Sequence, residues 1–239
     1  MIWNSGMVWW NVAAYVIPLL ACYRTEVQRH ETAGSDTLTA MQTVMVLVSQ
    51  QATDTPVVTH TAVLRTSLGT ITLGLYGKDA PKTVRNFVEL ARRGVYDGVL
   101  FHRVARNFVI QAGDPLTKDP KQRARWGTGG TSIYGGEFED ELNPETPSYR
   151  LGYQLGTVAM ANRGPNTNTS QFFICLERAA NLPKAYTIFG RVLDGMEVVR
   201  KIAEVAIEPG HFGPGDGTPK TPVVIQSVKV REVSQPKGR

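Results

Sequence analysis

The chain has 239 residues, 42% of them hydrophobic and 20% charged, with a formal net charge of +5. That length suits one β domain with a substantial core and an appendage. Only two cysteines occur, Cys22 and Cys175, in regions of different character, which argues against a disulfide framework. No Cys/His cluster has metal-ligand spacing, so we expect no metal and no cofactor, and the modest positive charge does not require nucleic acid as a direct partner.

Residues 1–24 form an apolar leader with no charged side chain before Arg24. An uncharged stretch of this length is typical of a membrane segment or a signal peptide. It lacks the basic start that a signal normally has, and several polar residues interrupt it. Three interpretations stay open: membrane or secretory targeting through Met1 to Tyr23, an unstructured leader, or translation that begins at Met41 or Met45.

Residues 25–60 are rich in Thr, Gln and Ser and have no sustained hydrophobic period outside the run 44–48. This composition predicts a polar, disordered linker. The residue pattern changes at Thr61, and we expect one domain over residues 61–232 and a tail over residues 233–239.

From Thr61 onward, short β-branched runs alternate with Gly and Pro, a pattern typical of a closed or nearly closed β architecture. The first two strands are expected to form a hairpin that turns at residues 67–69. Asp79 offers an N-cap for the helix that follows, with Pro81 in its first turn and Gly94 at its end. The expected elements are strands over 62–65, 70–76, 100–104, 109–111, 157–161, 172–176, 188–192 and 223–230, a second helix over 196–203, and a Gly/Pro loop over 209–222.

Several separated motifs carry the strongest signal. They are Phe101–Val104 continuing through Phe108–Asp114, Met160–Ile174 and Ile188–Val192, with support from Ala80–Phe87 and Gly129–Gly135. Together these motifs resemble the cyclophilin family. The resemblance implies a mainly β fold, a closed eight-stranded antiparallel β-barrel capped by two α-helices, and a peptidyl-prolyl cis/trans isomerase that works without a cofactor.

The short link Gly94–Gly98 and the first helix resemble the small cyclophilins associated with spliceosomes. The partners implied are proline-containing peptide or protein segments, with spliceosomal proteins as one source. Cytoplasmic or nuclear residence is the expectation, and a membrane-anchored or secretory protein is the alternative through the leader. Two other classes stay open: a weakly catalytic module that docks proline-containing segments of ribonucleoprotein partners, and a membrane-tethered chaperone.

Rotation about an X-Pro amide meets a barrier of about 18 to 20 kcal/mol, because the nitrogen lone pair is delocalised into the carbonyl. A catalyst can hold the proline ring and donate a hydrogen bond to the nitrogen as its lone pair localises. Arg103 suits this donor role because its guanidinium is always charged and presents donors in a fixed fork, which Gln111 is placed to orient. The alternative for Arg103 is a strand arginine in a surface salt bridge.

The resemblance also implies which residues bind the substrate. Taken alone, the apolar ones among them are expected in the core. Asn162 lies where the family grips the substrate chain with its backbone. His102 is interpreted as structural, because the reaction requires no proton transfer. The expected substrate-binding residues are Phe108, Val109, Ala161, Asn162, Phe173, Leu182 and Tyr186.

Four departures from the family pattern stand out. Asn181 replaces a tryptophan that contacts cyclosporin, so cyclosporin binding is expected to be weakened. Tyr186 replaces a histidine of the pocket. Arg163 replaces a small residue near a secondary pocket and either admits acidic side chains or narrows the entrance. Residues 116–126 are a basic insertion, for which a solvated loop is preferred over a partner site; its cations are Lys118, Lys121, Arg123 and Arg125.

Overall fold

A computed structural model describes residues 55–210 and 213–234. These residues fall within one compact unit, Asp54–Arg239. The leader and most of the predicted linker lie outside the described residues. Within the described ranges, no helix is both long and apolar enough to cross a membrane.

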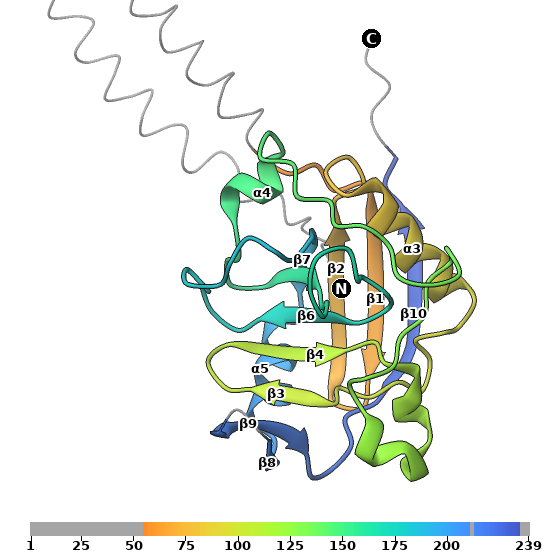
Figure 1. Cartoon of the computed structure of the whole chain (residues 1–239), viewed down its shortest axis with the longest axis vertical. Helices are drawn as coiled ribbons and strands as arrows, with labels where there is room; N and C mark the ends of the chain where they lie inside the picture. Colours follow the sequence, from red (N-terminus) through yellow and green to blue (C-terminus); the bar gives the residue numbers. More distant parts are fainter. Residues whose placement is uncertain (1–54, 211–212, 235–239) are drawn as a thin grey trace, which may run out of the picture. The chain divides into compact units, whose positions relative to one another are not determined.

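All strands of the described chain belong to one antiparallel sheet, with the order β10-β1-β2-β7-β5-β6-β4-β3-β9-β8 (Figure 1). The strands are β1 (His60–Thr66), β2 (Gly69–Leu75), β3 (Arg103–Ala105), β4 (Val109–Ala112), β5 (Thr157–Met160), β6 (Phe172–Cys175), β7 (Ile188–Asp194), β8 (Ile207–Gly210), β9 (Gly213–Pro219) and β10 (Ile225–Glu232). The helices are α3 (Pro81–Arg92), α4 (Pro147–Leu151) and α5 (Met196–Glu204), with two 3₁₀ helices, η1 (Pro115–Lys118) and η2 (Pro120–Arg125). The mainly β, antiparallel prediction is confirmed.

The predicted eight-stranded closed barrel is not confirmed. The structure has ten strands in a sheet that ends at β10 and β8. The two extra strands arise because part of the Gly/Pro loop expected over 209–222 pairs as the hairpin β8–β9. Glycine permits this pairing: a Cβ on Gly217 would lie 1.9 Å from the carbonyl oxygen of Glu208, so only a residue without a side chain fits.

The core lies between the sheet and the two expected helices, α3 and α5. Helix α3 packs against β10, and α5 packs against β2, β3 and β4 (Figure 1). Phe87 of α3 sits at the centre, in edge-to-face contact with Phe172 at 5.7 Å and tilted against Tyr96 at 4.9 Å between ring centroids. These rings are almost fully buried, and such packing contributes beyond the apolar area it removes from water.

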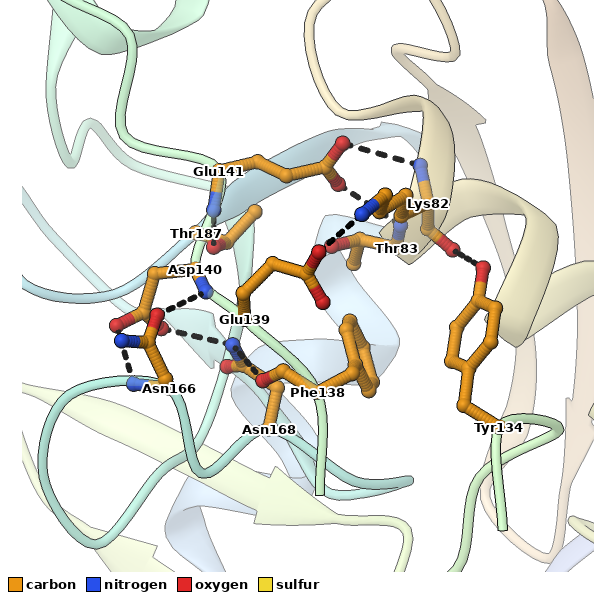
Figure 2. A network of polar contacts seen from close by, with 10 residues as sticks. All are labelled: Lys82, Thr83, Tyr134, Phe138, Glu139, Asp140, Glu141, Asn166, Asn168 and Thr187. Carbon is orange, nitrogen blue, oxygen red and sulfur yellow. Dashed lines mark hydrogen bonds and ion pairs between the residues drawn. The ribbon is translucent and has the colours of Figure 1, made fainter. Parts of the chain in front are cut away.

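The predicted N-cap of the first helix is wrong. Helix α3 begins at Pro81 as expected, but its N-cap residue is Ala80, which has no capping side chain. The Glu141 carboxylate instead accepts hydrogen bonds from the backbone N–H groups of Lys82 at 3.0 Å and Thr83 at 2.8 Å (Figure 2). Asp79 accepts from the backbone N–H of Ser148 at 2.8 Å and so serves the first turn of α4.

The hairpin β1–β2 turns where the sequence predicts, with Thr66 opposite Gly69. The domain begins slightly before the expected Thr61. Strand β1 starts at His60, and the backbone N–H of Thr59 donates to the carbonyl of Leu75 at 2.9 Å. Pro56 is buried as well. The last residues of the predicted linker therefore pack onto the domain.

Candidate functional site

A hollow of about 480 Å³, which we call the main hollow, opens beside strands β3, β4 and β9. Residues from several separate stretches of the sequence line it. It brings together every residue that the sequence predicts to be catalytic or substrate-binding: Arg103, Phe108, Val109, Gln111, Ala161, Asn162, Phe173, Leu182 and Tyr186.

Arg103 and Gln111 are directly opposite each other on the paired strands β3 and β4. Residues paired in this way project from the same face of an antiparallel sheet, which places their side chains together. Arg103 Nη1 donates to Gln111 Oε1 at 3.3 Å. The predicted orienting contact between these two side chains is therefore present.

Asp216 is a third member of this group that the sequence did not reveal. It lies on β9, which pairs with β3. Arg103 Nε donates to both Asp216 oxygens, at 2.9 and 3.1 Å, and Nη2 donates to Oδ2 at 2.6 Å. A bidentate fork of this kind fixes the plane of the guanidinium. The only signal in the sequence was that Asp216 is the single charged residue of the run Gly213–Pro219.

Gln171 continues the polar chain beyond Gln111. Its Oε1 accepts from Gln111 Nε2 at 2.9 Å, and its Nε2 donates to the carbonyl oxygens of Gly127 at 3.0 Å and Gly129 at 2.5 Å. Each amide uses its oxygen and its nitrogen toward different partners, which determines its orientation. Gln171 is buried and lies in a predicted motif, but it is not among the predicted site residues.

Asn162 is held by its own side chain. Its Nδ2 donates to the carbonyl of Ala185 at 2.8 Å and approaches Asp140 Oδ1 at 3.4 Å. Asp140 also accepts from the backbone N–H of Asn166 and from Asn168 Nδ2, both at 2.7 Å. The network in Figure 2, which includes Asp140, joins the loop that carries Asn166 and Asn168 to the start of α3. It fixes the backbone that the resemblance assigns to gripping substrate.

An aromatic cluster supports one wall of the main hollow. The Phe173 and Tyr186 rings meet edge to face, with centroids 5.6 Å apart and an interplanar angle of 83°. The hydroxyl of Tyr153 behind them accepts from the backbone N–H of Tyr186 at 3.0 Å. Burial raises the pKa of Tyr153 to about 12, so this hydroxyl stays protonated and can also donate to a nearby carbonyl.

His102 also lines the main hollow, but it is only 5% exposed. Burial lowers its pKa to about 4, although nearby Asp114 opposes that shift. The imidazole is therefore neutral at pH 7 and brings no charge to the site. No group of three His, Cys, Asp or Glu side chains in the described chain could hold a metal ion.

A second hollow of about 330 Å³ adjoins the main hollow and shares Gln111, Ala161 and Asn162 with it. Arg163 lines it, as the sequence suggested, but its charge is paired: Nη2 lies 2.5 Å from Glu137 Oε1. Asn181 lines neither of these hollows. It is exposed in a smaller depression together with Phe108 and Leu182.

The chain matches a family model described as cyclophilin type peptidyl-prolyl cis-trans isomerase over residues 61–230. It belongs to this family, and its mainly β, antiparallel fold agrees with that assignment.

Individual relatives agree with this assignment. The chain is 49% identical over 142 residues to peptidyl-prolyl cis-trans isomerase CYP18-2 of Arabidopsis thaliana, covering 59% of this chain and 79% of that protein. It is also 49% identical to human peptidyl-prolyl cis-trans isomerase-like 1 over 142 residues, 59% of this chain and 78% of the relative. Among solved structures, it is similar to a cyclophilin type isomerase of Cryptosporidium parvum crystallised in the presence of the dipeptide ala-pro. The TM-score is 0.61 and the sequence identity is 31%, and the match covers 72% of this chain and 98% of that chain.

Proposed function

We propose that this peptidyl-prolyl isomerase binds X-Pro segments of proteins in the main hollow, with Arg103 as the principal catalytic group. The observation that carries the proposal is the convergence of all the expected residues on one hollow, with the Arg103 guanidinium held at its wall by Asp216 and Gln111. A fixed donor beside an apolar wall is what the reaction needs.

The proline ring rests against Phe108, Phe173 and Leu182, and the Asn162 backbone aligns the chain. In the planar amide, the nitrogen lone pair is delocalised and accepts hydrogen bonds poorly. In the twisted state the lone pair localises, and Arg103 donates to it. This interaction is stronger in the transition state than in the ground state, so it lowers the barrier without simply tightening substrate binding.

Asp216, Gln111 and Gln171 act through Arg103 as positioning residues. Their hydrogen bonds hold the guanidinium before substrate arrives, so little reorganisation is needed at the moment of rotation. Asp216 is also buried enough, at 12% exposure, for its pairing with Arg103 to be only partly screened by water.

Exchange NMR on a short, neutral Xaa-Pro peptide tests the proposal. The wild-type chain should accelerate a relaxation that otherwise takes tens of seconds or longer. Arg103→Ala should lower kcat/KM by about 100-fold or more, the usual scale for a lost transition-state donor. Arg106→Ala is the matched control, because Arg106 is exposed on the same hairpin and its side chain donates to the backbone carbonyl of Val205 at 3.3 Å.

Two results would contradict this assignment. Near-wild-type turnover by Arg103→Ala, with an unchanged melting temperature, would place the donor elsewhere. Equal relaxation with and without the wild-type chain would favour the alternative function, a weakly catalytic module that docks proline-containing segments.

We further propose that the client segments come from spliceosomal proteins and that the protein resides in the nucleus or cytoplasm. Support comes from the similarity of the link Gly94–Gly98 to the spliceosome-associated type and from 49% identity to human peptidyl-prolyl cis-trans isomerase-like 1. Tagging the C-terminus and fractionating cells test the proposed residence. Recovery of the full chain in a membrane pellet that resists alkaline carbonate would instead support anchoring through Met1 to Tyr23.

A further inference from the structure

A third hollow, which we call the basic groove, lies between the end of α3 and the 3₁₀ helices η1 and η2. It has a volume of about 620 Å³. Its cations are Arg93, Lys118 and Arg125, its apolar side chains are Val95, Pro115 and Leu116, and no acidic side chain of the described residues lines it. The basic insertion predicted as a solvated loop thus forms one side of a defined surface.

The insertion is built on a rigid frame. Asp114 Oδ1 accepts from the backbone N–H of Leu116 at 2.8 Å, and Oδ2 accepts from those of Gly127 at 2.6 Å and Gly129 at 3.1 Å. The buried hydroxyl of Thr117 donates to the Asp114 carbonyl at 2.7 Å. Because the groove is already ordered, binding of a partner here loses little conformational entropy of the groove.

Among the described residues, the groove cations have no carboxylate partner. Within residues 55–210 and 213–234, neither Arg93 nor Lys118 forms an ion pair, and Arg125 bonds the neutral amide of Gln122 at 3.2 Å. Arg123 of the same insertion differs, since it pairs with Glu208 at 2.8 Å. A set of like charges with no counter-charge repels itself and attracts an acidic partner.

The basic groove adjoins the second hollow. Residues 129–131 line both. A Cβ on Gly129 would meet Asp114 Oδ1 and Leu116, which lines the groove, whereas one on Gly130 would meet Thr169, which lines the second hollow. A thin glycine wall therefore separates the two, and the second hollow in turn adjoins the main hollow.

We propose that the basic groove binds an acidic segment of the same polypeptide whose proline occupies the main hollow. The acidic side chains meet the three cations, while an aliphatic side chain covers Val95 and Leu116. The idea rests on the proposed proline site and adds a substrate class to it. A protein partner is favoured over nucleic acid because, in the part of the chain that the structure describes, no aromatic side chain lines the groove for bases to stack on. Trp126 lies outside it, beneath Arg123.

Peptides that share one X-Pro core test the proposal. One carries a neutral Gly/Ser flank, and two carry an Asp/Glu flank before or after the proline. At low salt, the wild-type chain should turn over one acidic peptide with a kcat/KM about five- to tenfold above the neutral one, as expected for a few partly exposed charge contacts. High salt should remove the difference.

Two double variants of equal charge change separate local from long-range effects. Lys118→Glu with Arg125→Glu should abolish the acidic preference and leave turnover of the neutral peptide unchanged. Lys121→Glu with Lys229→Glu changes exposed lysines outside the groove and should retain the preference.

Equal loss in both double variants would overturn the proposal, because net charge would then explain the effect. The absence of any acidic preference in the wild type would overturn it as well, as would single-stranded RNA that displaces the acidic peptide with higher affinity. Turnover of the neutral peptide reports the proline site separately, so failure of the groove and failure of the proposed function are distinguishable.

Discussion

Two arginines beside adjoining hollows form ion pairs of nearly equal length in different surroundings. Arg103 Nη2 lies 2.6 Å from Asp216 Oδ2, and these side chains are 30% and 12% exposed. Arg163 Nη2 lies 2.5 Å from Glu137 Oε1, and these are 67% and 40% exposed. A pair largely removed from water is screened less and has more fixed geometry. Burial, rather than length, separates the pair that holds the proposed catalytic arginine from the pair on the surface.

Removing the charge of Asp216 is the strongest test of this contrast. Asp216→Asn replaces an accepting oxygen with an amide that points donors at the guanidinium. We expect kcat on a neutral peptide to fall about tenfold with KM little changed, and the free energy of unfolding to fall by about 2 kcal/mol, below the range for fully buried pairs.

Asp216→Glu provides the matching rescue, because it keeps the charge and should recover part of kcat. Unchanged kcat in Asp216→Asn, alongside a lower melting temperature, would mean that Asp216 only stabilises the fold.

Burial beside the main hollow also predicts a pH effect on stability through His102. Its folded pKa of about 4 lies below the unfolded value of about 6.5, so the unfolded state binds more protons between these values and stability falls as pH falls. The loss should reach about 1.5 kcal/mol between pH 6.5 and 5. Urea unfolding measures it, and His102→Gln should remove that part of the slope. An unaltered slope in the variant would assign the effect to other groups.

Cyclosporin probes the exposed depression that contains Asn181 and shares Phe108 and Leu182 with the main hollow. Asn181 offers neither the area nor the indole donor of tryptophan, so Asn181→Trp should strengthen binding by about tenfold, as a single aromatic anchor can. Ala180→Trp, one residue away and also exposed, is the control and should gain less. Titration calorimetry measures both. No gain at position 181 would mean that the family alignment around residues 181–186 is wrong.

The sequence predicted the parts of the site that lie in continuous motifs. Arg103 and Gln111 fall on one local hairpin, so their motif also determines their contact. Asp216 reaches Arg103 across 113 residues through pairing of a Gly/Pro segment that carries no strand signal. The Glu141 cap of α3 was missed for the same reason, since 58 residues separate it from Thr83. Contacts over such separations depend on the completed sheet.

The ordered turns of the basic insertion could have been predicted from its own residues. Asp114-Pro115 and Asp119-Pro120 each place an acidic N-cap before a proline, the usual start of a helical turn. Both aspartates accept the expected backbone hydrogen bonds, from Leu116 at 2.8 Å and Lys121 at 2.9 Å. The density of charge in the insertion is typical of a solvated loop, whereas these two local caps predict ordered turns.

Breaking the exposed pair should have the smallest effect. Glu137→Gln keeps the shape of the side chain and removes its charge, and we expect the free energy of unfolding to change by less than about 0.5 kcal/mol, because exposed pairs contribute little. Turnover of a neutral peptide should stay within about twofold of wild type for the same reason.

The variant leaves the Arg163 charge uncompensated beside the second hollow. Turnover of a peptide with Glu near the proline should therefore rise relative to its Gln counterpart at low salt, and this difference should vanish at high salt. If Glu137→Gln costs as much stability or kcat as Asp216→Asn in the same assays, exposure does not distinguish the two pairs and the second hollow takes part in positioning the catalytic group.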